Sequence, residues 1–197
     1  MKKISMLILL IMPLSLLSCV SQPTLSAKDK MKHQNAEQVA HALKLEGHVE
    51  GGFYRRTYQA DHRDFVTTPN GERFLMTSIY YMLTSKSPIG HFHLNKSDIM
   101  HYYHLGNSIR YTLIYPNGKL ETVVMGSDVT KGEVLQLMVK GGIWKASELL
   151  NGEYDYGLIS EAVTPGFDFA DMTLGHKEKL IAQFPEHTIL INKLTKD

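Results

Sequence analysis

The tripeptide His91-Phe92-His93 has the residue types and the spacing for chemistry. In a β-strand, residues two apart point to the same face, so the two imidazoles are expected to converge, as a metal site requires. A short turn follows, and the returning strand would bring the carboxylate of Asp98 beside the pair. The pattern therefore predicts a polar site built on two adjoining strands.

Two more histidines lie in the returning strand, at His101 and His104. If the strand is regular, His104 shares the parity of Asp98, whereas His101 points to the opposite face. We therefore place His104 with Asp98 in the expected site. Two interpretations of the histidines stay open. His91 and His93 are metal ligands, or the imidazoles serve only as hydrogen-bonding groups.

Two other segments combine turn residues with aromatic or acidic side chains. Gly141-Gly142 precede Trp144, the single tryptophan, which is either a wall of a ligand pocket or a core residue. Residues 165–171 contain Asp168 and Asp171 among aromatic residues. These carboxylates are either acid–base groups or turn residues that cap the backbone.

Composition restricts the classes of function. The chain has 197 residues, of which 43% are hydrophobic and 21% charged, as is typical of one globular domain. The formal net charge of +1 supplies no basic field for a nucleic acid, so no nucleic-acid partner is expected. A single cysteine excludes an intramolecular disulfide and a cysteine-rich metal site.

The N-terminus has the pattern of a bacterial lipoprotein signal. Lys2 and Lys3 precede an interrupted apolar run that is too short for a membrane-spanning helix, so residues 1–18 are predicted to be a signal peptide. Residues 16–19 resemble a lipobox, which implies lipidation of Cys19 and anchoring to a membrane of the cell envelope. An ordinary secretory signal is the alternative. Ser21, in place of an aspartate, slightly favours the outer membrane.

The rest of the chain divides into a tether and a folded domain. Residues 19–34 are predicted to be a flexible tether and residues 35–197 a single domain. Asn35 and Gln38 form an expected capping box at the start of a helix that stops near Gly47, and residues 176–184 predict a second helix. Pro116-Asn117-Gly118 predicts a hairpin turn. Short strands are expected at 53–59, 75–83, 99–105, 109–115, 120–125, 134–139 and 156–163, which indicates a β-sandwich or barrel.

Several segments, in the same order, resemble the Cupin 5 branch of the cupin superfamily. They are residues 50–58 (EGGFYRRTY), 77–83 (TSIYYML), 90–98 (GHFHLNKSD), 101–107 (HYYHLGN), 141–144 (GGIW) and 165–175 (PGFDFADMTLG), within a match of about residues 40–185. The resemblance implies an all-β fold, a double-stranded β-helix or jelly-roll barrel with short flanking helices, and often a homodimer.

The resemblance also implies where ligands would lie. His91 and His93 match the histidine pair of the first cupin motif, whose glutamate is missing, with Asp98 near its place. Lys145 stands where the second motif would supply another histidine. An ammonium group does not bind a metal and repels a divalent cation, so a divalent metal cofactor is disfavoured, and Lys145 is expected to face an anionic ligand or Asp98 instead.

Three functions follow as hypotheses. The favoured one is binding of a small polar ligand, sugar-like or anionic, inside the barrel. Its expected binding residues are His91, His93, Asp98, His104, Trp144 and Lys145. The alternative is an enzyme, either an isomerase or epimerase with His91 or His93 as the base or a metal-dependent cupin enzyme. The third is an anchored structural domain without chemistry.

Overall fold

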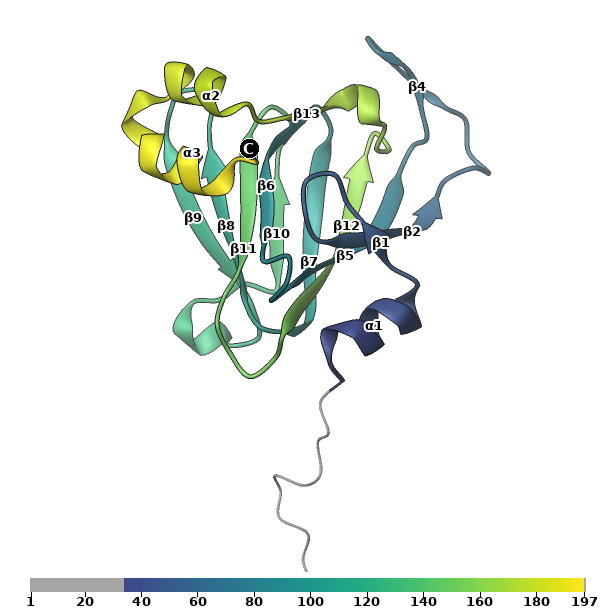
Figure 1. Cartoon of the computed structure of the whole chain (residues 1–197). Coiled ribbons are helices and arrows are strands. Elements are labelled where there is room, and N and C mark those ends of the chain that lie inside the picture. Colours follow the sequence, from purple (N-terminus) through teal and green to yellow (C-terminus); the bar gives the residue numbers. More distant parts are fainter. Residues whose placement is uncertain (1–33, 197) are drawn as a thin grey trace, which may run out of the picture. The chain divides into compact units, whose positions relative to one another are not determined.

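A computed structural model describes residues 34–196, so the predicted signal peptide, Cys19 and nearly all of the tether lie outside the described residues. Two antiparallel sheets form the domain (Figure 1). The first contains, in spatial order, β1 (Glu46–Gly47), β2 (Phe53–Gln59), β5 (Thr77–Thr84), β12 (Tyr156–Thr164), β7 (Asp98–Gly106) and β10 (Gln136–Val139). The second contains β13 (Met172–Leu174), β6 (Ile89–Asn95), β11 (Trp144–Leu149), β8 (Ile109–Ile114) and β9 (Leu120–Met125). The expected all-β fold with short flanking helices is confirmed.

Local turn chemistry explains how neighbouring strands pair. Residues Pro116, Asn117 and Gly118 connect β8 to β9, and the two strands pair from Ile109 opposite Met125 to Ile114 opposite Leu120. Gly118 has φ +81°, a left-handed conformation that glycine adopts without steric cost. The predicted hairpin is therefore confirmed. A second hairpin, β3 (Val66–Thr68) with β4 (Gly71–Arg73), stands apart from the two main sheets.

An apolar cluster fills part of the space between the two sheets. Tyr81 and Leu83 of β5 pack there against Tyr111 and Leu113 of β8, and all four side chains are buried. Full burial of one such side chain stabilises the fold by about 1.5–3 kcal/mol. The interior next to this cluster holds charged and polar side chains, which form the candidate site.

Helices cover the outer faces of both sheets. α1 (Ala36–Leu43) begins at the predicted capping box of Asn35 and Gln38 and packs through Val39. It ends at Lys44, whose left-handed φ of 54° stops the helix before the predicted end near Gly47.

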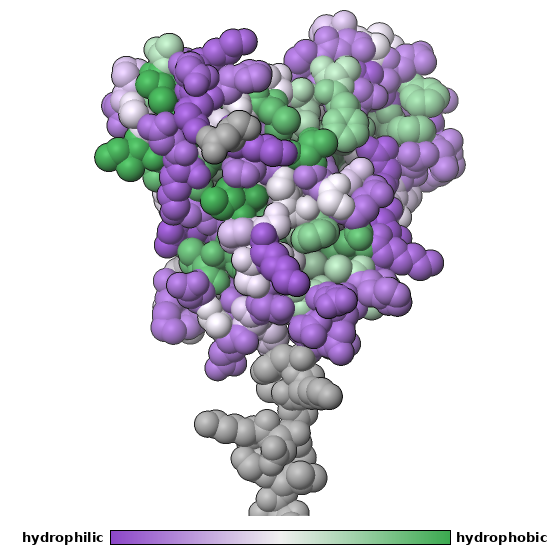
Figure 2. Space-filling model, in the orientation of Figure 1, coloured by the Kyte–Doolittle hydropathy of each residue, from purple (hydrophilic) through white to green (hydrophobic). Residues whose placement is uncertain are grey.

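The second sheet is covered by α2 (Lys177–Gln183) and α3 (Thr188–Leu194), drawn in yellow in Figure 1. The helix predicted at residues 176–184 is confirmed, and Leu180 and Phe184 pack there on Phe92 of β6. The η2 (Val129–Lys131), η3 (Phe169–Asp171) and η4 (Pro185–His187) turns are single 3₁₀ turns. No helix within residues 34–196 combines the length and the apolar character needed to cross a bilayer. Figure 2 shows apolar residues on one face in separate groups among hydrophilic ones.

Candidate functional site

Two cross-strand pairs, one from each sheet, meet in the interior. In the second sheet Lys145 of β11 lies directly opposite His93 of β6. In the first sheet Glu161 of β12 lies directly opposite His101 of β7. All four side chains are buried, and contacts between Lys145 and the other pair connect the two sheets. Buried charges of this kind require partners, which identifies the cluster as the polar centre of the domain.

Lys145, His101 and Glu161 satisfy one another. The Nδ1 of His101 donates to the carbonyl of Leu137 at 3.1 Å, so the lone pair of Nε2 accepts from Nζ of Lys145 at 2.9 Å. Glu161 Oε1 lies 3.3 Å from His101 Nε2 and 3.8 Å from Lys145 Nζ. Burial and the charge of Lys145 lower the pKa of His101. Burial, the largest single influence, would by itself raise the pKa of Glu161, but Lys145 together with His101 and His93 outweighs it and holds this pKa far below its ordinary value. The arrangement is a neutral imidazole between a cation and a carboxylate.

A loop between β1 and β2 brings a second carboxyl group to His93. Gly51, with φ +101°, lets the loop approach β6 so closely that a Cβ atom there would lie 2.2 Å from the carbonyl oxygen of Ile89. The N–H of His91 then donates to the carbonyl of Glu50 at 2.6 Å. As a result the Glu50 Oε2 atom lies 3.1 Å from His93 Nε2, and His48 Nδ1 lies 3.6 Å from the other carboxyl oxygen.

The hydrogen bonds of His93 define where its proton lies. Nδ1 is 2.8 Å from the carbonyl oxygen of His91, which can only accept, so Nδ1 carries the hydrogen and Nε2 presents a lone pair. Burial raises the pKa of Glu50 to about 8, although the charge of Lys145 opposes the shift. Burial and the same charge lower the pKa of His93 to about 3. At neutral pH the protonated carboxyl of Glu50 therefore donates to a neutral His93.

A cavity of about 360 Å³ opens above this pair. His48, Glu50, His93 and Glu161 contribute polar groups to its lining, and Tyr54, Phe167 and Phe169 contribute aromatic rings. The lining also includes Glu46, Arg56, Asn95, Asp168 and the aliphatic residues Ile79, Ile99 and Val163. A cavity of this size with a few buried polar groups and aromatic walls fits one small molecule.

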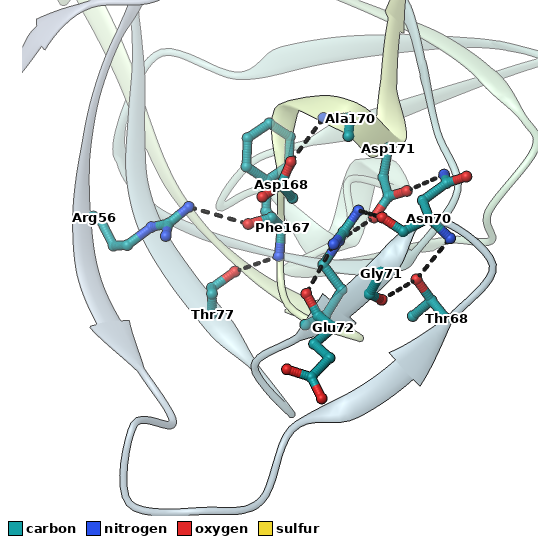
Figure 3. Close-up of polar contacts among 11 residues, drawn as sticks. Arg56, Thr68, Asn70, Gly71, Glu72, Thr77, Phe167, Asp168, Ala170 and Asp171 are labelled. Atoms are coloured by element: carbon teal, nitrogen blue, oxygen red, sulfur yellow. Dashed lines mark hydrogen bonds and ion pairs between the residues drawn. The ribbon is translucent and has the colours of Figure 1, made fainter.

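Backbone hydrogen bonds hold one wall of the cavity, the segment after β12, in place. The guanidinium of Arg56 donates to the carbonyl of Phe167 at 3.3 Å, and the N–H of Phe167 donates to Thr77 Oγ1 at 2.9 Å (Figure 3). Asp168 accepts from the N–H of Ala170 at 2.8 Å. These contacts fix the aromatic residues of the segment at the cavity edge.

An ion pair ties the same segment to the β3–β4 hairpin. Asp171 accepts from Nε of Arg73 at 2.6 Å and from the side-chain amide of Asn70 (Figure 3). The hydrogen bond from Arg73 lowers the pKa of the Asp171 carboxyl. Because Asp168 caps a turn and Asp171 pairs with an arginine, both carboxylates are engaged in holding the backbone, in line with the turn interpretation of this segment.

The structure brings only some of the predicted residues together. His93 and Lys145 lie in the cluster, and His91 contributes backbone contacts to Glu50 and His93. Asp98 does not return to the histidine pair, because β6 and β7 belong to different sheets. Its carboxylate is exposed and accepts from the N–H of Gly141 at 2.8 Å.

His104 and Trp144 also lie away from the cavity. His104 is exposed on the outer face of the first sheet, where its ring lies edge-on to Tyr80 at 5.9 Å. Trp144 packs with Phe92 and Leu180 beneath the C-terminal helices. Their placement in the expected site is corrected, because strand alternation directs both side chains away from the interior.

Four residues of the site were not predicted: His48, Glu50, His101 and Glu161. Glu161 could have been identified as a buried functional residue, since it is the one charged residue in the mostly apolar strand 156–163. His101 could have been placed inward from its parity with Ile99 and Tyr103. Glu50 and His48 lie in a loop, and no periodic pattern indicates their direction.

The donor atoms do not fit a metal ion. The ring nitrogens of His93 are engaged by Glu50 and the His91 carbonyl, and the cationic residue Lys145 lies opposite His93 in the neighbouring strand. Across residues 34–196, no cluster of three or more histidine, cysteine or acidic side chains could hold a metal. The described residues therefore do not supply the set of ligands that a tightly bound metal ion requires.

Comparisons with known proteins agree with this architecture. Residues 37–175 match the family described as Cupin superfamily (DUF985). The chain is 43% identical over 148 residues to an uncharacterised protein of Saccharomyces cerevisiae, covering 70% of this chain and 73% of the yeast protein. A solved structure of a Shewanella oneidensis protein is 36% identical with a TM-score of 0.74, covering 83% of this chain and 99% of that one. A hypothetical protein from Leishmania major is 28% identical with a TM-score of 0.78, covering 83% and 100%.

Proposed function

The chain belongs to the Cupin superfamily (DUF985) family, and on this premise we propose that it binds a small, uncharged polar molecule of the sugar or polyol class. The observation that carries the proposal is the cavity of about 360 Å³, whose lining includes the buried polar groups of His93, Glu50 and Glu161. Hydroxyl groups both donate and accept hydrogen bonds, so they can satisfy such a mixed set of groups.

The charges around the cavity favour an uncharged ligand over an anion. The cation nearest the floor, Lys145, is already compensated by Glu161. Glu46 and Asp168 add carboxylates to the lining and would repel an anion. Arg56 is the one lysine or arginine among the described residues that line the cavity, and its guanidinium donates to the Phe167 carbonyl.

Aromatic rings support the same ligand class. Phe167 and Phe169 lie edge-on to each other at 5.1 Å, and Phe169 stacks on the His48 ring at 6.4 Å. The apolar face of a sugar ring packs against such surfaces while its hydroxyl groups reach the polar floor.

Envelope anchoring remains a proposal that rests on the sequence alone. We infer that residues 1–18 direct export and that Cys19 carries the lipid, because residues 16–19 resemble a lipobox and contain the only cysteine. A ligand present outside the cytoplasm would then reach the domain directly.

A binding screen tests the ligand proposal. The probes are D-glucose, D-galactose, L-rhamnose, D-ribose and myo-inositol, scored by the rise in melting temperature and by calorimetry. We expect at least one probe to stabilise the wild type and His104→Asn, the control on the outer face, but to bind His93→Asn much more weakly. Failure of every probe to bind, or equal binding by His93→Asn, would contradict the proposal.

A further inference from the structure

We infer that Glu50 and His93 form an acid–base pair that moves a proton between neighbouring carbons of a bound hydroxy-carbonyl compound, such as an aldose or ketose. The inference rests on the proposed function, because it places the reaction in the same cavity and narrows the ligand class to a sugar with a free carbonyl group. Both side chains belong to the cavity lining.

The hydrogen-bond geometry gives each member of the pair one role. The His91 carbonyl keeps the hydrogen of His93 on Nδ1, which leaves one lone pair on Nε2. This lone pair accepts the proton of Glu50 in the free protein, and it becomes available as a base when a ligand carbonyl takes over the hydrogen bond from Glu50. Glu50 Oε2, 3.1 Å from that nitrogen, carries the proton that joins them and can act as an acid. A neutral acid and a neutral base side by side are the two groups that an enolisation needs.

The neighbouring titratable groups, His48 and Lys145, neither donate a proton to Glu50 nor take one from it. The backbone N–H of Glu50 donates to Nδ1 of His48 at 3.4 Å, so that nitrogen is an acceptor and does not protonate the carboxylate. The ammonium group of Lys145 contacts His101 and Glu161 instead of Glu50. The proton between Glu50 and His93 is therefore available for transfer to a ligand.

The proposed step is balanced without any co-reactant. The C–H bond next to the carbonyl breaks, its proton moves to His93 Nε2, and its electron pair forms the C=C bond of an enediol. At the same time Glu50 transfers its proton to the carbonyl oxygen. The product pair is an imidazolium and a carboxylate at 3.1 Å, whose attraction offsets the cost of charging His93 inside the protein. Reversal at the neighbouring carbon completes the isomerisation and restores the pair.

Deuterium exchange measures this step directly. The probes are D-glyceraldehyde, dihydroxyacetone, D-ribulose and D-ribose, incubated with the full chain in D₂O and followed by proton NMR. We expect the wild type to exchange the hydrogen next to the carbonyl of at least one probe faster than buffer does. Glu50→Gln should lose at least about a hundredfold of that rate, the usual contribution of general acid–base catalysis.

Glu50→Gln separates chemistry from binding. The side-chain amide of the glutamine can still donate to His93 Nε2, so the variant should fold and its affinity for the probe should change less than a few-fold. The glutamine has no acidic proton to transfer. Glu148→Gln is the matched control, because Glu148 is similarly buried but pairs with Lys193 on the other side of the sheet. It should keep the wild-type exchange rate.

The outcomes distinguish the two proposals. Binding of a probe without exchange, or exchange that persists in Glu50→Gln, overturns the acid–base pair and leaves ligand binding standing. If neither these probes nor those of the binding screen bind, both proposals are overturned. An independent readout is the ¹⁵N NMR spectrum of His93 at pH 6: a hydrogen on Nε2 in place of Nδ1 would overturn the pair whichever sugar is the substrate.

Discussion

Nζ of Lys145 lies 3.8 Å from Oε1 of Glu161, and the two residues come from opposite sheets of the barrel. Both side chains are almost fully buried, so neither charge is compensated by water. The pair connects the two sheets next to the cavity, whose lining includes Glu161. Burial, together with the charge of Lys145, lowers the pKa values of His93 and His101, whereas the carboxylate of Glu161 opposes this shift.

Removal of one partner of this pair should be costly. Lys145→Met or Glu161→Gln would leave an uncompensated buried charge, so each is expected to lower the free energy of unfolding by about 3–5 kcal/mol. The double variant should lose clearly less than the sum of the two. Urea unfolding at pH 7 measures all three. Lys131→Met, which breaks an exposed pair with Asp128, is the control and should have little effect. Additive losses in the double variant would contradict the pairing.

The pKa of Glu50 predicts a loss of stability on the alkaline side. Burial raises this pKa from 4.5 to about 8, so between these values the folded chain keeps a proton that the unfolded chain has released. Stability therefore falls as the pH rises through this range, with a slope of about 1.4 kcal/mol per pH unit for one proton. The charged or titratable groups around Glu50 are His48, Tyr81, His93, Tyr111, Lys145 and Glu161.

His93 acts in the opposite direction. Its pKa is lowered from 6.5 to about 3, so its contribution is lost as the pH falls through that range. Between the ordinary pKa values of the two groups the slopes cancel, and only the alkaline loss belongs to Glu50 alone. The free energy of unfolding of the wild type relative to Glu50→Gln should decline steadily as the pH rises toward 8. Parallel curves for the two proteins would show that Glu50 is ionised in the folded state.

Much of the fold follows from local patterns. The strands at Phe53–Gln59 and Leu120–Met125 have the predicted bounds, because alternation and turn residues define both of their ends. β11 (Trp144–Leu149) was missed, since Gly141, Gly142 and Trp144 indicate a turn and the strand begins immediately after it. Long-range pairing decides such cases, and it leaves no local pattern.

The site was harder to predict than the fold, and the reason is the C-terminal helices. Trp144 was predicted to be either a wall of the ligand pocket or a core residue, and the structure packs it in an apolar cluster outside the cavity. Here α2 and α3 bury the outer face of the second sheet as well, and that face takes Phe92 and Trp144. The inner face takes His93 and Lys145. When both faces of a strand are buried, hydrophobicity does not assign them, and only tertiary packing does.

Phe169 offers a test of the cavity edge. Its ring is 54% exposed and stacks on His48, so Phe169→Ala removes an aromatic surface without opening the core. We expect the affinity for a sugar probe to fall about tenfold, equivalent to about 1.4 kcal/mol, and the melting temperature to change little. Phe65→Ala is a matched control, because Phe65 is also 54% exposed but packs on Phe74 away from the cavity lining. Equal affinity losses in the two variants would exclude a specific role for Phe169.

The ion pair of Asp171 with Arg73 should affect ligand affinity indirectly, by holding the backbone of the cavity wall in place. Asp171→Asn weakens the contact with Arg73, so the segment from Phe167 to Asp171 is expected to lose its attachment to the β3–β4 hairpin. Amide hydrogen exchange in this segment should accelerate, and sugar affinity should fall several-fold while exchange in β8 and β9 stays unchanged. Asp61→Asn, an exposed aspartate, is the control. Unchanged exchange around Phe167 would show that the ion pair does not hold the segment.

Lipidation of Cys19 is the prediction that determines where in the cell the protein lies. If Cys19 is lipidated, the protein expressed from its full gene should sediment with membranes and carry a lipid adduct on the N-terminal peptide after removal of residues 1–18. Cys19→Ser should block lipidation, whether or not residues 1–18 are removed. Mass spectrometry should then detect no lipid adduct. Ser21→Asp should leave the adduct intact and shift the protein toward the inner-membrane fraction, if retention in this organism depends on that position. A wild-type chain without an acyl adduct would overturn the anchor, because the sequence then contains only an ordinary export signal with a coincidental cysteine.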